Sequence, residues 1–273
     1  MSSSILQRTL ASSCTVEGVG LHSNEPVKVT LFPASENSGI VFRTGDTIIP
    51  ATIQHVENTP RCTTLKKGKK QISTVEHFLA ACWGSDLDNL EVAVEGEELP
   101  GGDGSSLFWF NIFQKVGFQS QAAPRKYLIL HKDIKVEGDR CYLFAFPNEE
   151  FRVWYFLDGE GNGHFSQALE FSSNGDFSKL LSARTFAFSW EIREVLQRGW
   201  GKGVREKAFI VDEEGKSSVP LRFPGEAAGH KNLDLIGDLM LAGKRIKGYF
   251  IGIRSGHTLN RDMVRKIMEV SSE

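Results

Sequence analysis

Two residues spaced four apart in the C-terminal half could bind a metal ion, His230 and Asp234, and Asp238 follows at the same spacing. The surrounding sequence predicts a helix, and residues four apart on a helix lie on the same face. An imidazole and a carboxylate at this spacing can therefore reach a single cation. The spacing alone is weak evidence, because a solvated helix face or a helix N-terminal cap explains the same residue types.

A second group of reactive side chains, Glu76 and His77, lies early in an otherwise apolar segment after Ser73. Both have a purely structural explanation. Ser73 and Glu76 have the spacing of a capping box, in which a glutamate caps the start of a helix, and His77 could be a hydrogen-bonded histidine of the core. A further histidine, His257, follows a predicted strand, where a loop could present it to a cleft.

Taken together, His77, His230 and Asp234 have the composition of a catalytic zinc site, in which two histidines and one carboxylate leave a coordination position open. Structural zinc sites usually have four protein ligands, often cysteines, and the cysteines of this chain lack the required spacing. Fe²⁺ could occupy the same ligands, because affinity does not decide which metal a cell loads. The sequence therefore predicts a zinc-dependent hydrolase.

The remaining reactive side chains fit the proton transfers of such a hydrolase. A metal ion lowers the pKa of bound water to about 7 and polarises a carbonyl group. A carboxylate beside the ion can accept the proton of the water, and an imidazole opposite can protonate a leaving amine. Glu76 and His257 fit these two roles, and Asp238 could orient His257.

Helices must carry these side chains, and sheets must hold the helices in place. Alternating apolar and polar residues predict strands, whereas apolar residues at helical spacing predict helices. The basic run Lys66–Lys70 has Gly68 at its centre and predicts a hairpin tip. In the first half, the patterns predict strands at Leu6 to Cys14, Val27 to Phe32, Gly39 to Arg43 and Leu90 to Val94, a turn at residues 17–20, and helices at Val75 to Trp83 and Ser106 to Val116.

The second half repeats the order of strands followed by helices. Residues 120–125 are small and polar, include Pro124, and predict a linker near the midpoint of the chain. After it, the patterns predict strands at Tyr127 to Leu130, Asp133 to Val136, Cys141 to Phe146, Phe151 to Phe156 and Lys247 to Ile253, and helices at Ser189 to Arg198, Ala227 to Leu241 and Asn260 to Val270.

Strands clustered before helices predict an α+β fold rather than alternating strands and helices. We expect two similar domains, each a layered sheet-and-helix sandwich, with the active site in the cleft between them. Residues 1–121 would form the first domain and supply Glu76 and His77. Residues 126–273 would form the second and supply His230, Asp234 and His257.

The composition excludes several classes of protein. The formal net charge is −2, so there is no basic excess to predict binding of nucleic acid. No run of about 18 apolar residues predicts a membrane span, and the first residues lack the apolar region of a secretory signal. The four cysteines form no Cys-x-x-Cys pair, which predicts free thiols in a reducing compartment. We therefore expect a cytoplasmic protein without an integral membrane segment, and a monomer.

With these residues in this order, the sequence resembles the UDP-3-O-acyl-N-acetylglucosamine deacetylase (LpxC) family, the zinc amidases of lipid A synthesis. The resemblance runs over nearly the whole chain. Its motifs are Gln7-Arg8-Thr9, Glu17 to Ser23, Asn58-Thr59 with Cys62-Thr63, Ser73 to His77, Asp103-Gly104-Ser105, Arg184-Thr185-Phe186, His230-Lys231 with Asp234, Ile236 to Leu239, and Ser255-Gly256-His257 with Leu259-Asn260.

The resemblance implies two α+β domains with the site between them, and zinc on His77, His230 and Asp234. It also implies Glu76 as the general base and His257 as the general acid. The implied reaction is hydrolysis of the acetamide of a UDP-linked, acylated amino sugar, with release of acetate.

The resemblance implies further roles around the metal. Asp238 would be the partner of His257, and Thr185 would help to hold the oxyanion, with Lys231 nearby. For substrate binding, Phe186 would line the cleft and Arg254 could contact a diphosphate. Both also have a purely structural explanation: Phe186 could be an ordinary core residue, and Arg254 could be a solvated arginine.

The sequence departs from the family pattern at several positions. Gly229 stands where the family usually has arginine, Arg61 stands beside Cys62 where an apolar residue is common, and residues 101–104 replace the usual loop sequence. Cys62 could lie near the metal or be a buried filler. Residues 158–165, where the resemblance places the acyl-chain passage, are short, polar and rich in glycine.

These departures leave three hypotheses open. The first is the deacetylase with an acylated UDP-N-acetylglucosamine substrate. The second keeps the zinc amidase and the fold but changes the substrate to another N-acyl amino sugar, because of residues 158–165. The third is a non-catalytic binding module, since a fold alone does not establish a function.

Overall fold

The computed structural model describes residues 5–159, 165–204 and 207–271 of the chain. Within the N-terminal half of these residues, a five-stranded sheet has the order β2-β3-β9-β4-β5, beside a two-stranded sheet (β1, β10) and a three-stranded sheet (β6, β7, β8). The elements are β1 (Leu6–Leu10), β2 (Cys14–Val19), β3 (Pro26–Pro33), β4 (Ile40–Thr44), β5 (Thr47–Pro50), η1 (Ile53–His55), β6 (Val56–Glu57), β7 (Thr64–Lys67), β8 (Lys70–Ile72), α1 (Glu76–Gly84), β9 (Leu90–Glu95), α2 (Leu107–Val116) and β10 (Phe118–Pro124).

The C-terminal half contains a six-stranded sheet in the order β12-β13-β18-β14-β15, with β11 paired to β18, and a small sheet of β16 and β17. Its elements are β11 (Tyr127–Ile129), β12 (Ile134–Gly138), β13 (Cys141–Phe146), β14 (Phe151–Asp158), β15 (Ser166–Ser172), α3 (Phe177–Leu181), β16 (Phe186–Phe188), η2 (Ser189–Glu191), α4 (Ile192–Gln197), η3 (Lys202–Val204), β17 (Phe209–Val211), α5 (Glu226–Leu239), η4 (Met240–Ala242), β18 (Arg245–Ile253) and α6 (His257–Val270).

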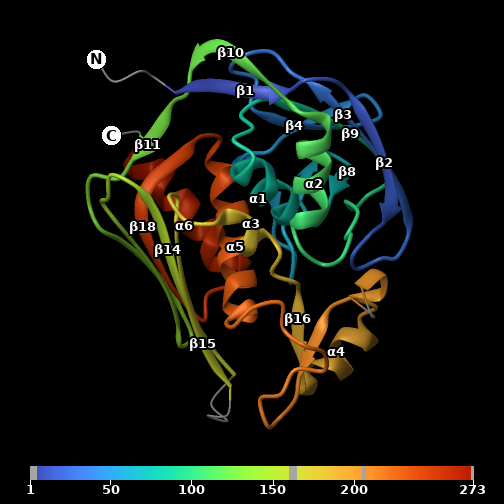
Figure 1. Ribbon diagram of the computed structural model, residues 1–273, viewed down its shortest axis with the longest axis vertical. Helices are drawn as coiled ribbons and strands as arrows, with labels where there is room; N and C mark the ends of the chain where they lie inside the picture. The colour runs from blue at the N-terminus through green and yellow to red at the C-terminus, as the bar shows by residue number, and fades with distance from the viewer. Residues whose placement is uncertain (1–4, 160–164, 205–206, 272–273) are drawn as a thin grey trace.

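Helices α1 and α5 lie side by side in the middle of the molecule, with the N-terminal sheet on one side and β14, β15 and β18 on the other (Figure 1). One apolar core runs through both halves and includes Phe78 of α1, Leu235 of α5 and Ile267 of α6. A smaller apolar cluster forms around Tyr155 and Phe209. The two central helices are therefore fixed by packing from both halves of the chain.

The sequences of α1 and α5 explain why both helices are central. All residues of α1 from Glu76 to Trp83 are buried, and so are all residues of α5 except Lys231. A helix that is buried all round needs small and apolar residues on every face, and α1 has them in the run Phe78–Cys82. The few polar side chains on these helices are consequently the ones that need an explanation.

The structure confirms the predicted α+β fold, because each half has a sheet with helices packed against it. The boundaries at residues 121 and 126 stay a prediction. The predicted hairpin tip at Lys66–Lys70 is confirmed by the pairing of β7 with β8.

Three local predictions are wrong. The predicted linker at residues 120–125 overlaps β10, because this segment pairs with β1 as a strand through Pro124. The predicted turn at residues 17–20 falls largely within β2. Helix α6 begins at His257 rather than Asn260, so His257 is the first residue of a helix and not part of a loop.

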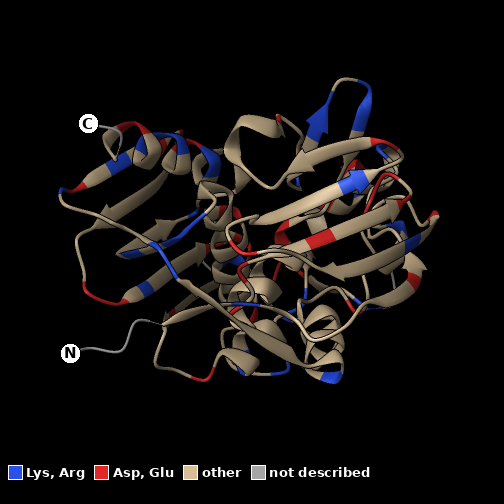
Figure 2. Cartoon of the chain, turned by 90° about the horizontal axis from the view of Figure 1, so that it is seen from above, with Lys and Arg blue, Asp and Glu red and all other residues tan. Residues whose placement is uncertain are grey.

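Charged residues of both signs lie along the described chain (Figure 2). Acidic and basic residues are interspersed over the chain and do not gather in one basic stripe (Figure 2). Among the described residues, no helix is both long and apolar enough to cross a membrane. All four cysteines are free thiols, and Cys62 and Cys82 are buried.

Candidate metal centre

His77, His230 and Asp234 meet at the interface of α1 and α5, and all three are buried. Their ligand atoms all lie within 4.8 Å of one another. Nε2 of His77 lies 3.6 Å from Oδ1 of Asp234, and Nε2 of His230 lies 3.4 Å from the same oxygen. That oxygen has no hydrogen-bond donor in the described part of the chain. A buried carboxylate oxygen facing two imidazole nitrogens without a donor is the arrangement that a divalent cation satisfies.

Close packing of two helices brings the three ligands together. A Cβ atom built on Gly237 would lie 2.1 Å from the backbone oxygen of Glu76. Only glycine therefore allows α5 to approach the start of α1 this closely. On α5, His230 and Asp234 share one face at a spacing of four, while His77 projects from the first turn of α1.

Neighbouring groups hold the ligands in the geometry that a cation needs. Nδ1 of His230 lies 3.1 Å from the backbone oxygen of Ala183, so its Nε2 is the nitrogen that faces Asp234. Burial lowers the pKa of His230 to about 4, which keeps the ring neutral as a metal ligand requires. Burial favours the protonated form of Asp234, but His230 and Lys231 hold the pKa of this carboxyl well below its usual range.

Glu76 is held beside the cluster by the backbone and is not a helix cap. Its Oε2 accepts a hydrogen bond of 3.0 Å from the backbone N–H of Thr63, and no side chain caps the start of α1. The capping-box interpretation is therefore wrong.

Thr74, two residues before Glu76, has a positive φ of 59° and donates to buried Glu98 at 2.9 Å. Strained backbone of this kind often marks a functional site. Burial raises the pKa of Glu76.

His257 and Asp238 form a second buried pair at the same place. Nδ1 of His257 lies 2.8 Å from Oδ2 of Asp238, and Nε2 lies 3.9 Å from Oε1 of Glu76. Asp238 also accepts hydrogen bonds from Thr63 Oγ1 at 2.5 Å and from Asn260 at 2.9 Å. Burial works against the charged ring of His257, but Asp238 outweighs it and raises the pKa to about 9.

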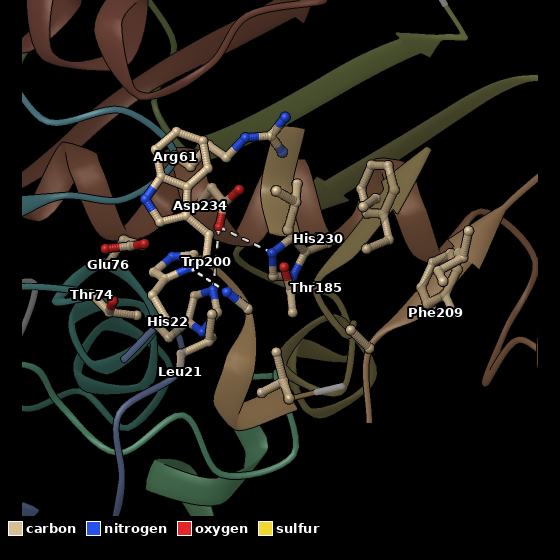
Figure 3. A pocket seen from close by; sticks show the side chains of 18 of the residues that line it. Leu21, His22, Arg61, Thr74, Glu76, Thr185, Trp200, Phe209, His230 and Asp234 are labelled. Atoms are coloured by element: carbon tan, nitrogen blue, oxygen red, sulfur yellow. Dashed lines mark hydrogen bonds and ion pairs between the residues drawn. The ribbon is translucent and has the colours of Figure 1, made fainter. Parts of the chain in front are cut away.

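The cluster opens into a cavity of about 430 Å³ with mainly apolar walls. In Figure 3, His230 and Asp234 approach each other at the cavity wall, with Glu76 to one side and Phe209 at the far end. Phe186 stacks on Phe209 with ring centroids 5.5 Å apart. A cavity of this size next to a possible metal site suits a ligand with an apolar part.

Three of the predicted substrate and oxyanion residues line this cavity: Thr185, Phe186 and Lys231. Nζ of Lys231 lies 2.9 Å from Oδ2 of Asp234. Two others do not line it. Cys62 lies in a neighbouring cavity of about 590 Å³, and Arg254 pairs with Asp158 at 3.4 Å.

The expectation that residues 158–165 carry the acyl-chain passage stays a prediction. Residues 160–164 lie outside the described residues, and Asp158, Gly159 and Phe165 are not among the residues that line the cavity. Among the described residues, the apolar walls come from Leu21, from residues within 186–204 and from residues 208–210. A Cβ atom on Gly229 would lie 2.9 Å from the end of the Phe223 ring, so a larger residue at this position would require that ring to shift.

Several residues of the site were missed by the sequence analysis. Thr63 contacts both Glu76 and Asp238, although 175 residues separate it from Asp238. His22, assigned no role from the sequence, lines the cavity together with Trp200, and its Nδ1 accepts a hydrogen bond of 3.2 Å from the N–H of Gly201. No local pattern could have found them, because their neighbours are distant in sequence.

Comparison with known proteins identifies the family of this chain. Residues 7–269 match the family model described as LpxC, UDP-3-O-acyl N-acetylglycosamine deacetylase. A UDP-3-O-acyl-N-acetylglucosamine deacetylase of Chlamydia abortus is 36% identical over 272 residues, covering 97% of each chain. The protein of that name from Myxococcus xanthus is 37% identical over 97% of this chain and 87% of its own, and that from Coxiella burnetii is 34% identical over 98% and 92%. The chain therefore belongs to the LpxC family of UDP-3-O-acyl-N-acetylglucosamine deacetylases.

Proposed function

We propose that this protein hydrolyses the acetamide of UDP-3-O-acyl-N-acetylglucosamine and releases acetate, a step of lipid A biosynthesis. The observation that carries the proposal is the buried cluster of His77, His230 and Asp234, with Glu76 and His257 beside it and an apolar cavity next to it. Family membership supports the choice of substrate.

His77, His230 and Asp234 would hold the metal, which we propose to be Zn²⁺, with Fe²⁺ as the alternative. Two imidazole nitrogens and one carboxylate oxygen are the donor set of catalytic zinc, and the unpartnered Oδ1 of Asp234 supports it. When bound, the ion supplies a Lewis acid that polarises the amide carbonyl and makes water more acidic.

The proton transfers belong to Glu76 and His257. Glu76 is buried and its pKa is raised, so it is a stronger base than an exposed glutamate and accepts the proton of the attacking water. His257 carries a proton, because Asp238 raises its pKa to about 9, and it donates that proton to the leaving amine. Asp238 orients the ring of His257 through Nδ1.

The substrate contacts follow from the walls of the cavity. Thr185 and Lys231 stabilise the negative charge that develops on the carbonyl oxygen. Phe186 and the apolar wall residues contact the 3-O-acyl chain. Arg254 and Cys62 lie away from this cavity, so a diphosphate contact by Arg254 is the weaker part of the proposal. The monomeric state and the cytoplasmic location stay predictions.

A substrate panel tests the proposal. Acetate release is measured with UDP-3-O-acyl-N-acetylglucosamine and with non-acylated UDP-N-acetylglucosamine, each with and without a chelator, followed by addition of Zn²⁺ or Fe²⁺. We expect a strong preference for the acylated compound, loss of activity on chelation and recovery with metal. Equal rates on both compounds would favour another N-acyl amino sugar. Full activity in the presence of chelator, with no metal bound, would rule out the metal mechanism.

A further inference from the structure

One wall of the cavity consists of residues that are all half-buried or exposed except Val204, with Trp190 stacked on Phe188 near their start. We call residues 189–204 the wall segment; it contains η2, α4 and η3. Its residues Ile192, Val195 and Leu196 line the cavity. Ile192 and Val195 are only half-buried, and Leu196 is 51% exposed. A six-residue helix is too short to be stable without tertiary contacts, so other interactions must keep it over the cavity.

Polar contacts from the N-terminal half hold both ends of the wall segment. At its start, Nη2 of Arg61 donates to Oε1 of Glu191 at 2.6 Å. At its other end, the N–H groups of residues 201 and 203 donate to His22 Nδ1 at 3.2 Å and to the backbone oxygen of Leu21 at 3.0 Å. The segment between these two contacts contains α4.

Arg61 is placed to make the first of these contacts. Its guanidinium lies 5.5 Å from the ring centroid of Trp200, within cation–π distance, and Figure 3 shows the two side chains next to each other at the cavity. Arg61 has a positive φ of 62°, an unfavourable conformation for this residue type. Glu191 is fixed in turn, because its Oε2 accepts from the N–H of Phe188 at 2.9 Å.

We propose that Arg61 is a positioning residue for the acyl chain: its contacts with Glu191 and Trp200 form a clasp that holds α4 against the apolar cavity. This inference rests on the proposed deacetylase function. The clasp touches no reacting atom, so it acts on the binding of the acyl chain and not on the hydrolysis of the acetamide. Releasing it lets α4 move away and exposes the chain to water, which weakens binding in proportion to the apolar surface lost.

Arg61→Met and Glu191→Gln test the clasp, because Met keeps the unbranched apolar stem of arginine and Gln keeps the shape of glutamate, while both remove the charge pair. We expect KM for the acylated substrate to rise roughly tenfold in Arg61→Met, from loss of a partly buried ion pair and a cation–π contact, with kcat unchanged. KM and kcat for non-acylated UDP-N-acetylglucosamine should not change. The double variant should show no more than the larger single effect, because the two residues act as one unit.

Arg43→Met and Glu91→Gln are matched controls. Their side chains form an ion pair of the same length, 2.6 Å, with similar exposure (38% and 37%, against 30% and 29% for Arg61 and Glu191). Arg43 also lies over an aromatic ring, that of Phe32, at 5.9 Å. This pair joins β4 to β9, away from the cavity, so neither control should alter KM for the acylated compound.

Binding of dodecanoate, measured by titration calorimetry on the metal-loaded protein, separates failure of the clasp from failure of the proposed function. Weaker binding to Arg61→Met than to the wild type or Arg43→Met supports the clasp, even if the wild type hydrolyses neither sugar nucleotide. An unchanged KM for the acylated substrate together with unchanged dodecanoate affinity would overturn it. So would an equal loss on acylated and non-acylated substrates, since that indicates a general structural defect.

Discussion

The metal centre and the wall segment lie on the same cavity but are held in place in different ways. The ligands lie on α1 and α5, which are buried almost completely and packed by one core from both halves of the chain. The wall segment is half-buried or exposed except at Val204, and polar contacts from residues 21, 22 and 61 hold its two ends. Core packing gives rigid geometry, whereas isolated polar contacts are weak and can be released.

The difference matches what each region must do. Hydrolysis requires the ligands and the proton-transfer groups to keep their positions within a fraction of an ångström. In the proposed function an acyl chain must enter and leave, so its wall benefits from low local stability. We therefore expect changes at the centre to affect turnover and metal content, and changes in the wall segment to affect binding of the acyl chain.

The largest effect is expected from removing a ligand. His230→Ala leaves two of the three proposed donors, so the bound metal per chain should fall and activity should drop to background. The apolar core of α1 and α5 does not depend on the ion, and far-ultraviolet circular dichroism should show a folded protein. Metal analysis by mass spectrometry checks the first point. Normal metal content in this variant would show that His230 is not a ligand.

The next largest effect is expected from Glu76→Gln. Glutamine keeps the shape and can still accept from the N–H of Thr63, but it cannot accept the proton of water. We expect kcat to fall roughly 10²- to 10⁴-fold, the usual contribution of general base catalysis, with metal content unchanged. Steady-state kinetics and metal analysis on one preparation provide the test. Wild-type turnover would assign the base to another residue.

A smaller effect, on stability, is expected where the two helices touch. Gly237→Ala places a Cβ atom 2.1 Å from the backbone oxygen of Glu76, so α1 and α5 must separate. We expect a loss of about 1–3 kcal/mol in the free energy of unfolding, as for other overpacked sites, and reduced turnover from displacement of Glu76. Urea denaturation measures the first effect. Gly256→Ala is the control, because a Cβ atom there meets nothing within 4 Å.

The smallest effect is expected in the wall segment. Leu196→Ala removes a side chain that is 51% exposed, so the free energy of unfolding should change by no more than about 0.5 kcal/mol. Leu235→Ala on α5 is the contrasting variant. Loss of its fully buried side chain should lower the free energy of unfolding by about 2–5 kcal/mol. Similar losses in the two variants, measured by urea denaturation, would remove the distinction between the two regions.

Most helices and strands could be predicted because their patterns are local. The helix around His230 was predicted within one or two residues at its start, and Gly243, in the left-handed conformation at φ 71°, follows the helical turn η4 as expected for a helix stop. The linker at residues 120–125 was wrong, because the pairing of β10 with β1 joins segments more than 100 residues apart. Small polar residues alone do not distinguish a linker from an edge strand.

For the site, too, local spacing could be predicted from the sequence, whereas contacts between distant segments could not. The spacing of His230, Asp234 and Asp238 was readable from the sequence, because a helix places every fourth residue on one face. Whether Glu76 caps a helix or faces a metal depends on a hydrogen bond from Thr63, which no local pattern contains.

By itself, the sequence determined the reactive residue types, their order along the chain and the family to which they belong. Only the tertiary structure decided that Gly237 brings α1 against α5 and that Thr63 joins Glu76 to Asp238. It also decided that Leu21 and residues within 186–204 and 208–210 supply the apolar lining of the cavity. The physical reason is that ligand spacing is a property of a single helix, whereas a cavity wall is made by segments that meet only when the chain is packed.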